Sequence, residues 1–308
     1  MQVARVVRAA AVAAVLMMSG GANAQQVVDS NFQPVVEHPA FKPDHGPVIM
    51  VDEAHFNLHR VSGQYAPFAD VLRKDGYRVA PFKTKFTAKA LKEGHVLVIA
   101  NALTASIDAN WDAPPQSAFT DEEIGSVREW VKKGGALFLI VDHLPCPGAI
   151  EKLASSFGVK WSNGFAQDPK SGGLITFTRP DGALAEHAIT RGRNDSERID
   201  SVMTFAGSAF EAAEAEPLLT FTGEAVSWLP KSAYKLEAGS PSVSVKGWRQ
   251  GAVLHYGKGR VAFFGEAAMF TAQRVGPQAD PMGMNNPRAR QNQQFLLNVV
   301  HWLTGVLK

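Results

Sequence analysis

Three short apolar runs, at 48–51, 96–99 and 136–141, stand out in the first half of the chain. They are rich in Val, Ile and Leu and nearly free of polar residues, which is typical of strands buried on both faces. Between the first two runs, apolar residues recur at spacings of three and four over 65–72, which predicts a helix. The alternation of strand and helix predicts an α/β fold with a doubly wound, mostly parallel sheet.

Two more helices are predicted around the third apolar run. Thr120 and Glu123 have the spacing of a capping box, and the helix that they open ends at Gly134-Gly135. After the run, Ile150 and Phe157 belong to a second helical pattern that stops at Gly158. The order of strands and helices is therefore maintained up to about residue 160.

The second half of the chain is less regular. From about 160 to 250, Gly, Pro and Ser are frequent, which predicts an insertion-rich middle of antiparallel or irregular structure. We interpret 46–308 as one domain. Its remaining predicted elements are strands at 174–177 and 217–221, a hairpin of 252–256 and 260–264 around Gly257-Lys258-Gly259, and a closing helix at about 288–307.

Residues 1–24 have the three parts of a secretory signal peptide. Arg5 and Arg8 precede the apolar run Ala9–Met18, and Ala22-Asn23-Ala24 is a cleavage motif. We therefore expect a periplasmic or secreted protein, with 25–45 as an extended lead-in. No later stretch reaches about 18 apolar residues, so no membrane anchor is expected after cleavage.

Composition narrows the function classes. The chain has 308 residues, 45% of them hydrophobic, and a formal net charge of +2 that would fall to zero without Arg5 and Arg8. A neutral chain of this kind is not expected to bind nucleic acid through bulk charge. Cys146 is the single cysteine, so an intramolecular disulfide is excluded.

Polar residues follow the apolar runs at the points where the predicted strands end. Ligands of open parallel sheets bind outside the carboxyl ends of the strands, and residues at those ends meet at one edge. We therefore expect one pocket for a small polar ligand, formed by Asp52, Glu53, His55, Asp142, His143 and Glu266, with His59 and Asn101 nearby.

Within this set we predict catalytic roles for His55, Asp142 and His143. Three interpretations remain open: a divalent metal site such as Zn²⁺ or Mn²⁺, acid–base chemistry without a metal, and buried hydrogen bonds that only brace loops. His55 and His59 are four residues apart and would share one face of a helical turn, although the string is not HExxH.

We interpret two other residues, Cys146 and Trp111, as structural. Cys146 lies between Pro145 and Pro147, a poor setting for a nucleophile elbow, so we interpret it as a buried hydrophobic residue. Trp111 is interpreted as a packing anchor of its loop in preference to a ring-stacking platform. The chain has no GxSxG, P-loop or GxGxxG motif.

Several strings over about residues 46–307 resemble the bacterial family called domain of unknown function 4350, of the class I glutamine amidotransferase-like superfamily. The strings are Asp52-Glu53-Ala54-His55, 65–72, Asp75-Gly76-Tyr77, 99–103, Ser117-Ala118-Phe119-Thr120, Asp142-His143, Gly265-Glu266, and Asn292 with Phe295-Leu296-Leu297-Asn298.

The resemblance implies a flavodoxin-like α/β core with its site at the strand ends. Catalytic members of the superfamily place a Cys nucleophile in a glycine-flanked turn after a central strand. Here that turn resembles Asp142-His143-Leu144-Pro145, without the Cys, so amidotransferase activity is not expected. The leading hypothesis is an exported protein that binds a polar ligand, carbohydrate-related or processed by metal-assisted hydrolysis. The alternative is a non-catalytic binding or assembly module that retains the fold.

Overall fold

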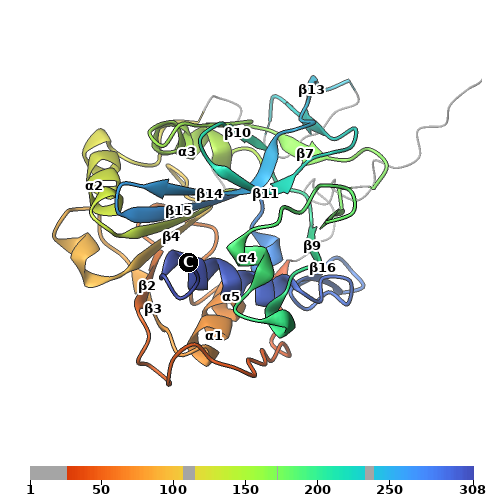
Figure 1. Cartoon of the computed structure of the whole chain (residues 1–308). Helices are drawn as coiled ribbons and strands as arrows, with labels where there is room; N and C mark the ends of the chain where they lie inside the picture. Colours follow the sequence, from red (N-terminus) through yellow and green to blue (C-terminus); the bar gives the residue numbers. More distant parts are fainter. Residues whose placement is uncertain (1–25, 107–114, 172, 233–238) are drawn as a thin grey trace, which may run out of the picture.

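The computed structural model describes residues 26–106, 115–171, 173–232 and 239–308. The predicted signal peptide and Trp111 lie outside these residues. A nine-stranded sheet forms the centre of the molecule, in the order β3-β2-β4-β5-β15-β14-β10-β6, with β11 also paired to β14 (Figure 1). Its strands are β2 (Val48–Asp52), β3 (Arg78–Phe82), β4 (Val96–Ala100), β5 (Ala136–Ile140), β6 (Val159–Trp161), β10 (Phe210–Ala212), β11 (Glu216–Thr220), β14 (Arg249–Tyr256) and β15 (Gly259–Phe264).

The sheet is mixed, which corrects the expectation of a mostly parallel one. Strands β3, β2, β4, β5 and β15 are parallel, whereas β14, β10, β6 and β11 are joined to the sheet by antiparallel pairings. The direction changes at the β14–β15 hairpin, where Tyr256 pairs with Gly259 across a two-residue loop. Gly257 has a φ of +61° there, and a Cβ would lie 2.6 Å from the carbonyl oxygen of Lys132. The predicted hairpin is confirmed.

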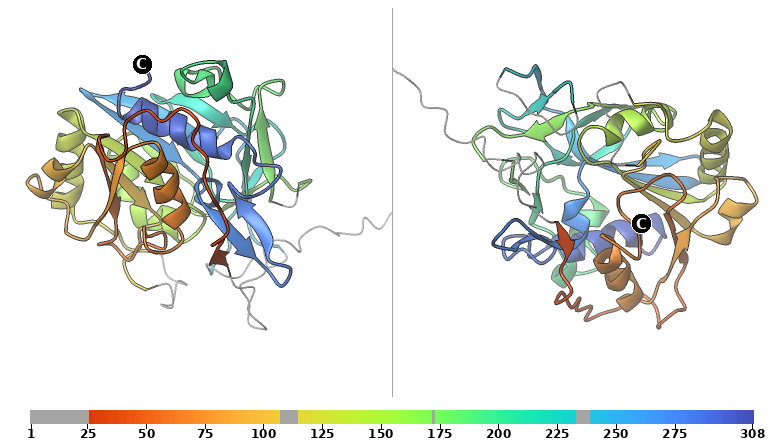
Figure 2. Two further views of the ribbon diagram at one scale, coloured as in Figure 1. Left: turned by 90° about the horizontal axis from the view of Figure 1, so that it is seen from below. Right: turned by 180° about the vertical axis from the view of Figure 1, so that it is seen from behind.

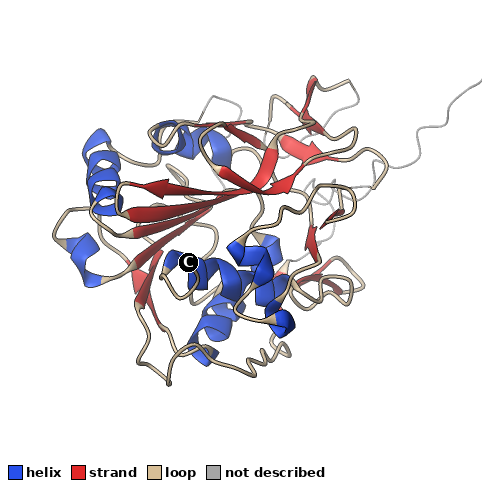
Figure 3. Cartoon of the chain, viewed as in Figure 1, coloured by secondary structure: helices blue, strands red, loops and turns tan. Residues whose placement is uncertain are grey.

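Helices cover both faces of the sheet (Figures 1 and 3). Strand residues alternate between the faces, so Phe138 packs in the apolar cluster of one face and Leu139 in that of the other. The first cluster includes residues of α1 and α5, and the second includes residues of α2 and α3. The helices are α1 (Ala66–Lys74), α2 (Asp121–Lys132), α3 (Cys146–Ser155), α4 (Ala188–Arg191) and α5 (Asn292–Leu303).

The capping box predicted at the start of α2 is present. The Thr120 hydroxyl accepts the N–H of Glu123, and the Glu123 carboxylate accepts the N–H of Thr120.

Smaller sheets flank the central one. The N-terminal segment and the C-terminal third of the chain meet in the sheet β1-β16-β17 (Figure 2). The remaining elements are β1 (Val27–Val28), β16 (Ala272–Val275), β17 (Asp280–Gly283), β7 (Phe165–Gln167), β12 (Val226–Trp228), β13 (Ser242–Ser244), β8 (Ile175–Thr178), β9 (Ser201–Thr204), and the 3₁₀ turns η1 (Ala90–Glu93), η2 (Asp195–Glu197) and η3 (Ala268–Phe270). None of the helices in the described residues is long and apolar enough to cross a membrane.

Candidate ligand pocket

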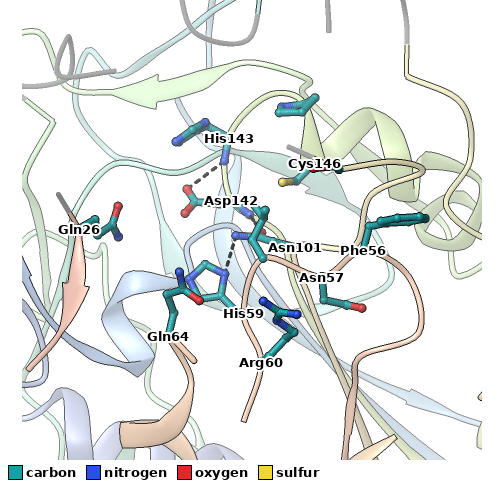
Figure 4. A pocket seen from close by; sticks show the side chains of 13 residues that line it. Gln26, Phe56, Asn57, His59, Arg60, Gln64, Asn101, Asp142, His143 and Cys146 are labelled. Carbon is teal, nitrogen blue, oxygen red and sulfur yellow. Dashed lines mark hydrogen bonds between the residues drawn. The ribbon is translucent and has the colours of Figure 1, made fainter. Parts of the chain in front are cut away.

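A pocket of about 480 Å³ opens where β4 and β5 end, beside the loop that follows β2 (Figure 4). This volume lies within the range of about 300–1,000 Å³ that is usual for small-molecule sites. The polar and apolar side chains of its wall come from three loops and from the start of α3. They belong to Phe56, Asn57, Leu58, His59, Arg60, Gln64, Asn101, Asp142, His143, Pro145 and Cys146, with Gln26 and Ser106 also lining the pocket.

Asn101 holds two of these loops together. It follows β4 with a φ of +50°, a left-handed conformation that Asn tolerates better than most residues. Its side-chain oxygen accepts the backbone N–H of Asp142 at 2.7 Å, and its side-chain nitrogen lies 3.1 Å from Nδ1 of His59. The end of β5 and the loop after β2 are therefore fixed to one buried amide.

His59 is buried and uncharged. Burial lowers its pKa to about 4, although the nearby charge of Asp142 acts in the opposite direction. Its ring packs edge-on against Tyr65, with the ring centroids 4.7 Å apart. Nδ1 faces the amide of Asn101, so the other nitrogen, Nε2, is the one left for a ligand.

Asp142 and His143 follow β5 and face the pocket. The Asp142 carboxylate accepts the backbone N–H of His143 at 2.9 Å, and it is drawn between the rings of His143 and His59 in Figure 4. Nδ1 of His143 donates to the carbonyl of Leu144 at 2.9 Å, and the ring stacks on Phe165 with centroids 4.2 Å apart. In a neutral imidazole whose Nδ1 donates to Leu144, Nε2 carries the lone pair, and the described residues offer no partner to this nitrogen.

Cys146 lines the pocket but is not activated. Burial, and secondarily the charge of Asp142, raise the pKa of its thiol well above its ordinary value. The thiol is therefore protonated at neutral pH. This environment agrees with the interpretation of Cys146 as a buried hydrophobic residue.

Glu266 follows β15, is buried, and is not among the residues that line the pocket. Its two carboxyl oxygens accept the backbone N–H groups of Ala268 at 2.6 Å and Met269 at 2.8 Å. Burial, followed by the charge of Asp142, raises the pKa of Glu266 well above its ordinary value. Its role in this structure is to hold the turn η3.

His55 lies between two carboxylates and does not line the pocket. Nδ1 donates to both oxygens of Asp52, at 2.9 and 3.0 Å, and Nε2 donates to Glu123 Oε1 at 3.0 Å. The ring is packed between Phe86 and Phe119, at centroid distances of 4.5 and 4.8 Å. Burial opposes a charge on the ring, but the hydrogen bonds and charges of Asp52 and Glu123 outweigh it and raise the pKa of His55.

The expectation that six predicted residues share one pocket is wrong. Asp142 and His143 line it, whereas Asp52 and His55 form the buried cluster with Glu123, and Glu266 binds η3. Glu53 lines a smaller adjoining hollow. The segment between His55 and His59 is not helical, so these two residues point to different surroundings. Both ring nitrogens of His55 are occupied, which disfavours the catalytic role predicted for it.

Sequence reasoning missed Glu123, Phe56 and Arg60. Glu123 was recognised only as a capping residue, yet its carboxylate also binds His55. Phe56 has a φ of +46° and keeps 58% of its surface exposed at the pocket. Holding a bulky residue in this backbone conformation costs about 1–3 kcal/mol of folding free energy. Strained residues of this kind cluster at functional sites. Its left-handed backbone has no signature in the sequence.

The described residues do not support the metal hypothesis. Among them, no group of three or more His, Cys, Asp or Glu side chains is arranged to hold a metal ion. Both ring nitrogens of His55 are bound to carboxylates, and the hydrogen bond from Asn101 to Nδ1 of His59 puts the proton of that ring on Nε2, so neither of these two histidines has a lone pair for a metal. Acid–base chemistry without a metal and buried hydrogen bonds that brace the loops remain as interpretations of the pocket.

Comparisons with known proteins support only the fold. No protein-family model and no curated protein matches this sequence. A solved structure, the mmIFT52 N-terminal domain, is similar with a TM-score of 0.55 and 13% sequence identity, over 83% of this chain and 97% of that one. A cytoplasmic protein from Salmonella typhimurium matches at a TM-score of 0.49, 13% identity and coverage of 83% and 98%. A ThuA-like protein from Bacteroides uniformis matches at 0.45, 14% identity and coverage of 90% and 96%.

Proposed function

We propose that this chain is an exported protein that binds a small polar ligand in the pocket, where Asp142 and His143 exchange a proton with it. The observation that carries the proposal is the pair of ring nitrogens left for a ligand. His143 offers the lone pair of Nε2 and His59 offers the N–H of Nε2, while the Asp142 carboxylate lies nearby. A fixed acceptor and a fixed donor suit a hydroxyl or carbonyl group on the ligand.

The place of the pocket in the sheet supports this proposal. The parallel strands have the order β3-β2-β4-β5-β15. Among these five, β2 comes first in the sequence, and it lies between β3 and β4, which come second and third. This is the order of flavodoxin-like sheets, which bind ligands at the point where the order reverses. The loop after β2 and Asn101 after β4 both line the pocket at that point. We accordingly propose a flavodoxin-like core. We propose membership of the domain of unknown function 4350 family on the resemblance of sequence strings such as Asp52-Glu53-Ala54-His55 and Asp142-His143.

Ligand-observed NMR on the purified mature chain tests the proposal. The probes are neutral sugars, sugar acids, hydroxy acids and amino acids, measured with the wild type and with Asp142→Asn and His143→Gln. Loss of a hydrogen bond to a charged or ionisable partner costs about 1.5–3 kcal/mol, so each substitution should weaken binding tenfold or more. Asp280→Asn and His45→Gln are matched controls, because Asp280 is exposed and His45 is an exposed histidine whose Nδ1 also donates to a backbone carbonyl. If all four variants bind the probes as tightly as the wild type does, the proposal is contradicted.

A non-catalytic binding module is the second candidate. It is favoured by the raised pKa of Cys146, whose protonated thiol is not an activated nucleophile. Prolonged incubation of the bound probe with the protein separates the two candidates. Chemical change of the probe that requires His143 supports catalysis, whereas recovery of the intact probe supports binding alone.

Export is tested separately from ligand binding. The motif Ala22-Asn23-Ala24 places the mature N-terminus near Gln25. Mass spectrometry of the protein made in its native host should find that terminus in the periplasm or the medium. An intact Met1 in the soluble fraction would contradict export and leave the ligand proposal untouched.

A further inference from the structure

A second hollow adjoins the ligand pocket. It has a volume of about 220 Å³, and Glu53 and Ala54 are among the residues that line it. Phe56, Asn57 and Arg60 line both hollows. The two spaces therefore meet at these three residues, which we call the junction.

Phe56 is held at the junction by its neighbours. The side-chain oxygen of Asn57 accepts the backbone N–H of His55 at 3.1 Å, and the carbonyl of His55 accepts the N–H of Leu103 at 2.9 Å. The side-chain nitrogen of Asn57 donates to Asp52 at 3.0 Å. Buried hydrogen bonds thus fix the backbone on both sides of Phe56 and keep its ring exposed in a left-handed conformation.

Arg60 provides a positive charge at the same place. Its carbonyl accepts the backbone N–H groups of Gly63 and Tyr65, which anchors its position in the loop. In the described part of the chain, no carboxylate forms an ion pair with its guanidinium group, and the side chain is exposed. An arginine in this state can bind a carboxylate or a phosphate with two parallel hydrogen bonds.

We infer that Phe56 and Arg60 select an anionic, ring-containing ligand, with one face of the ring on Phe56 and the acidic group at Arg60. This inference rests on the proposed function. Asp142, which also lines the pocket, orients the ligand. Its negative charge repels the acidic group of the ligand, and its carboxylate oxygens accept hydrogen bonds from the hydroxyls. Sugar acids and sugar phosphates share the required chemistry, an apolar ring face with hydroxyls and an anion.

Calorimetric titration with three related sugars tests the inference. Glucuronate and glucose 6-phosphate distinguish a carboxylate from a phosphate, and glucose is the neutral reference. We expect at least one anionic sugar to bind tenfold or more tightly than glucose. Arg60→Gln should remove this preference, and Phe56→Ala should weaken all three sugars about tenfold. Arg288→Gln and Val35→Ala, at exposed positions elsewhere, should bind as the wild type does.

Several outcomes would overturn the inference. Glucose binding as tightly as both anionic sugars removes the role of Arg60, and inorganic phosphate binding as tightly as glucose 6-phosphate removes the role of the ring. Phe56→Leu keeps bulk without an aromatic face and replaces Phe56→Ala if that variant does not fold. If Asp142→Asn weakens the binding of the anionic sugars while Arg60→Gln and Phe56→Leu leave it unchanged, the inference fails and the proposed function stands. If Asp142→Asn leaves the affinity for every bound probe unchanged, the proposed function itself is contradicted.

Discussion

The side-chain amide of Asn101 donates a hydrogen bond to Nδ1 of His59 over 3.1 Å. The orientation of the amide is fixed, because its oxygen accepts the backbone N–H of Asp142 at 2.7 Å. Nδ1 of His59 must then carry the lone pair, and Nε2 carries the proton. The pocket therefore presents His59 as a neutral hydrogen-bond donor whose tautomer is set by another side chain.

Asn101→Asp should reverse this tautomer. An Asp at this position tolerates the left-handed backbone and still accepts the N–H of Asp142, but its second oxygen can only accept from His59. The ring proton should move to Nδ1, and the added negative charge should raise the pKa of His59. Nitrogen-15 NMR of the histidine rings measures both effects.

Asn101→Gly is the matched variant for this experiment. It permits the same backbone conformation and removes both hydrogen bonds, so it should lower the free energy of unfolding by about 2 kcal/mol. A proton that remains on Nε2 in Asn101→Asp would show that the tautomer is set by something other than residue 101.

Neutral His59 should destabilise the protein in acid. Its folded pKa of about 4 lies below its ordinary value of 6.5, so the unfolded chain takes up a proton between these pH values and the folded chain does not. Stability from this group is complete above pH 6.5 and falls towards pH 4, by about 3 kcal/mol. Denaturant unfolding of wild type and His59→Gln should show a smaller loss over this range in the variant. Parallel curves would contradict the buried, neutral state.

The buried cluster of His55, Asp52 and Glu123 should stabilise the protein less as the pH rises towards the alkaline range, which is the opposite of the contribution of His59. The pKa of His55 is raised, so its contribution is complete below its unfolded pKa and is lost as pH rises through the folded value. The pKa of Glu123 is lowered, chiefly by hydrogen bonds that outweigh its burial, so its contribution is lost as pH falls below about 4.5. The cluster should therefore stabilise most near pH 5–6.

His55→Gln tests this window. Removing one partner of a buried ion pair costs about 3 kcal/mol or more, so the variant should be least stable relative to wild type near pH 6. The difference in the free energy of unfolding should shrink as pH rises to 9. His45→Gln, at an exposed histidine, should show no such trend. A difference that is constant with pH would mean that His55 is uncharged in the folded protein.

Cys146 should be unreactive although it lines the pocket. Its side chain is 2% exposed and its thiol pKa is raised by burial, so little thiolate forms at pH 7. We expect a disulfide reagent to label the native protein at least a hundredfold more slowly than the unfolded chain. If a ligand or an activity is found, Cys146→Ser should retain most of it, and a thousandfold loss would identify a nucleophile instead.

The sequence alone determined the elements that depend on local patterns. The apolar runs around Val51, Ile99 and Leu139 became strands buried on both faces, because only such strands need apolar residues at consecutive positions. Thr120 and Glu123 fixed the start of α2, and Gly257 fixed the hairpin, because capping and left-handed turns depend on residues within a few positions of each other.

Only the tertiary structure decided which polar side chains face the pocket. His55 and His59 follow the same strand, yet His55 turns to Glu123, 68 residues away in sequence, and His59 turns to Asn101. The direction of a side chain in an irregular loop depends on partners from distant segments, which the residue pattern does not encode locally. The antiparallel half of the sheet could not be predicted from the sequence for the same reason. Strands β6 and β10 are short, and they pair with strands that are distant in sequence.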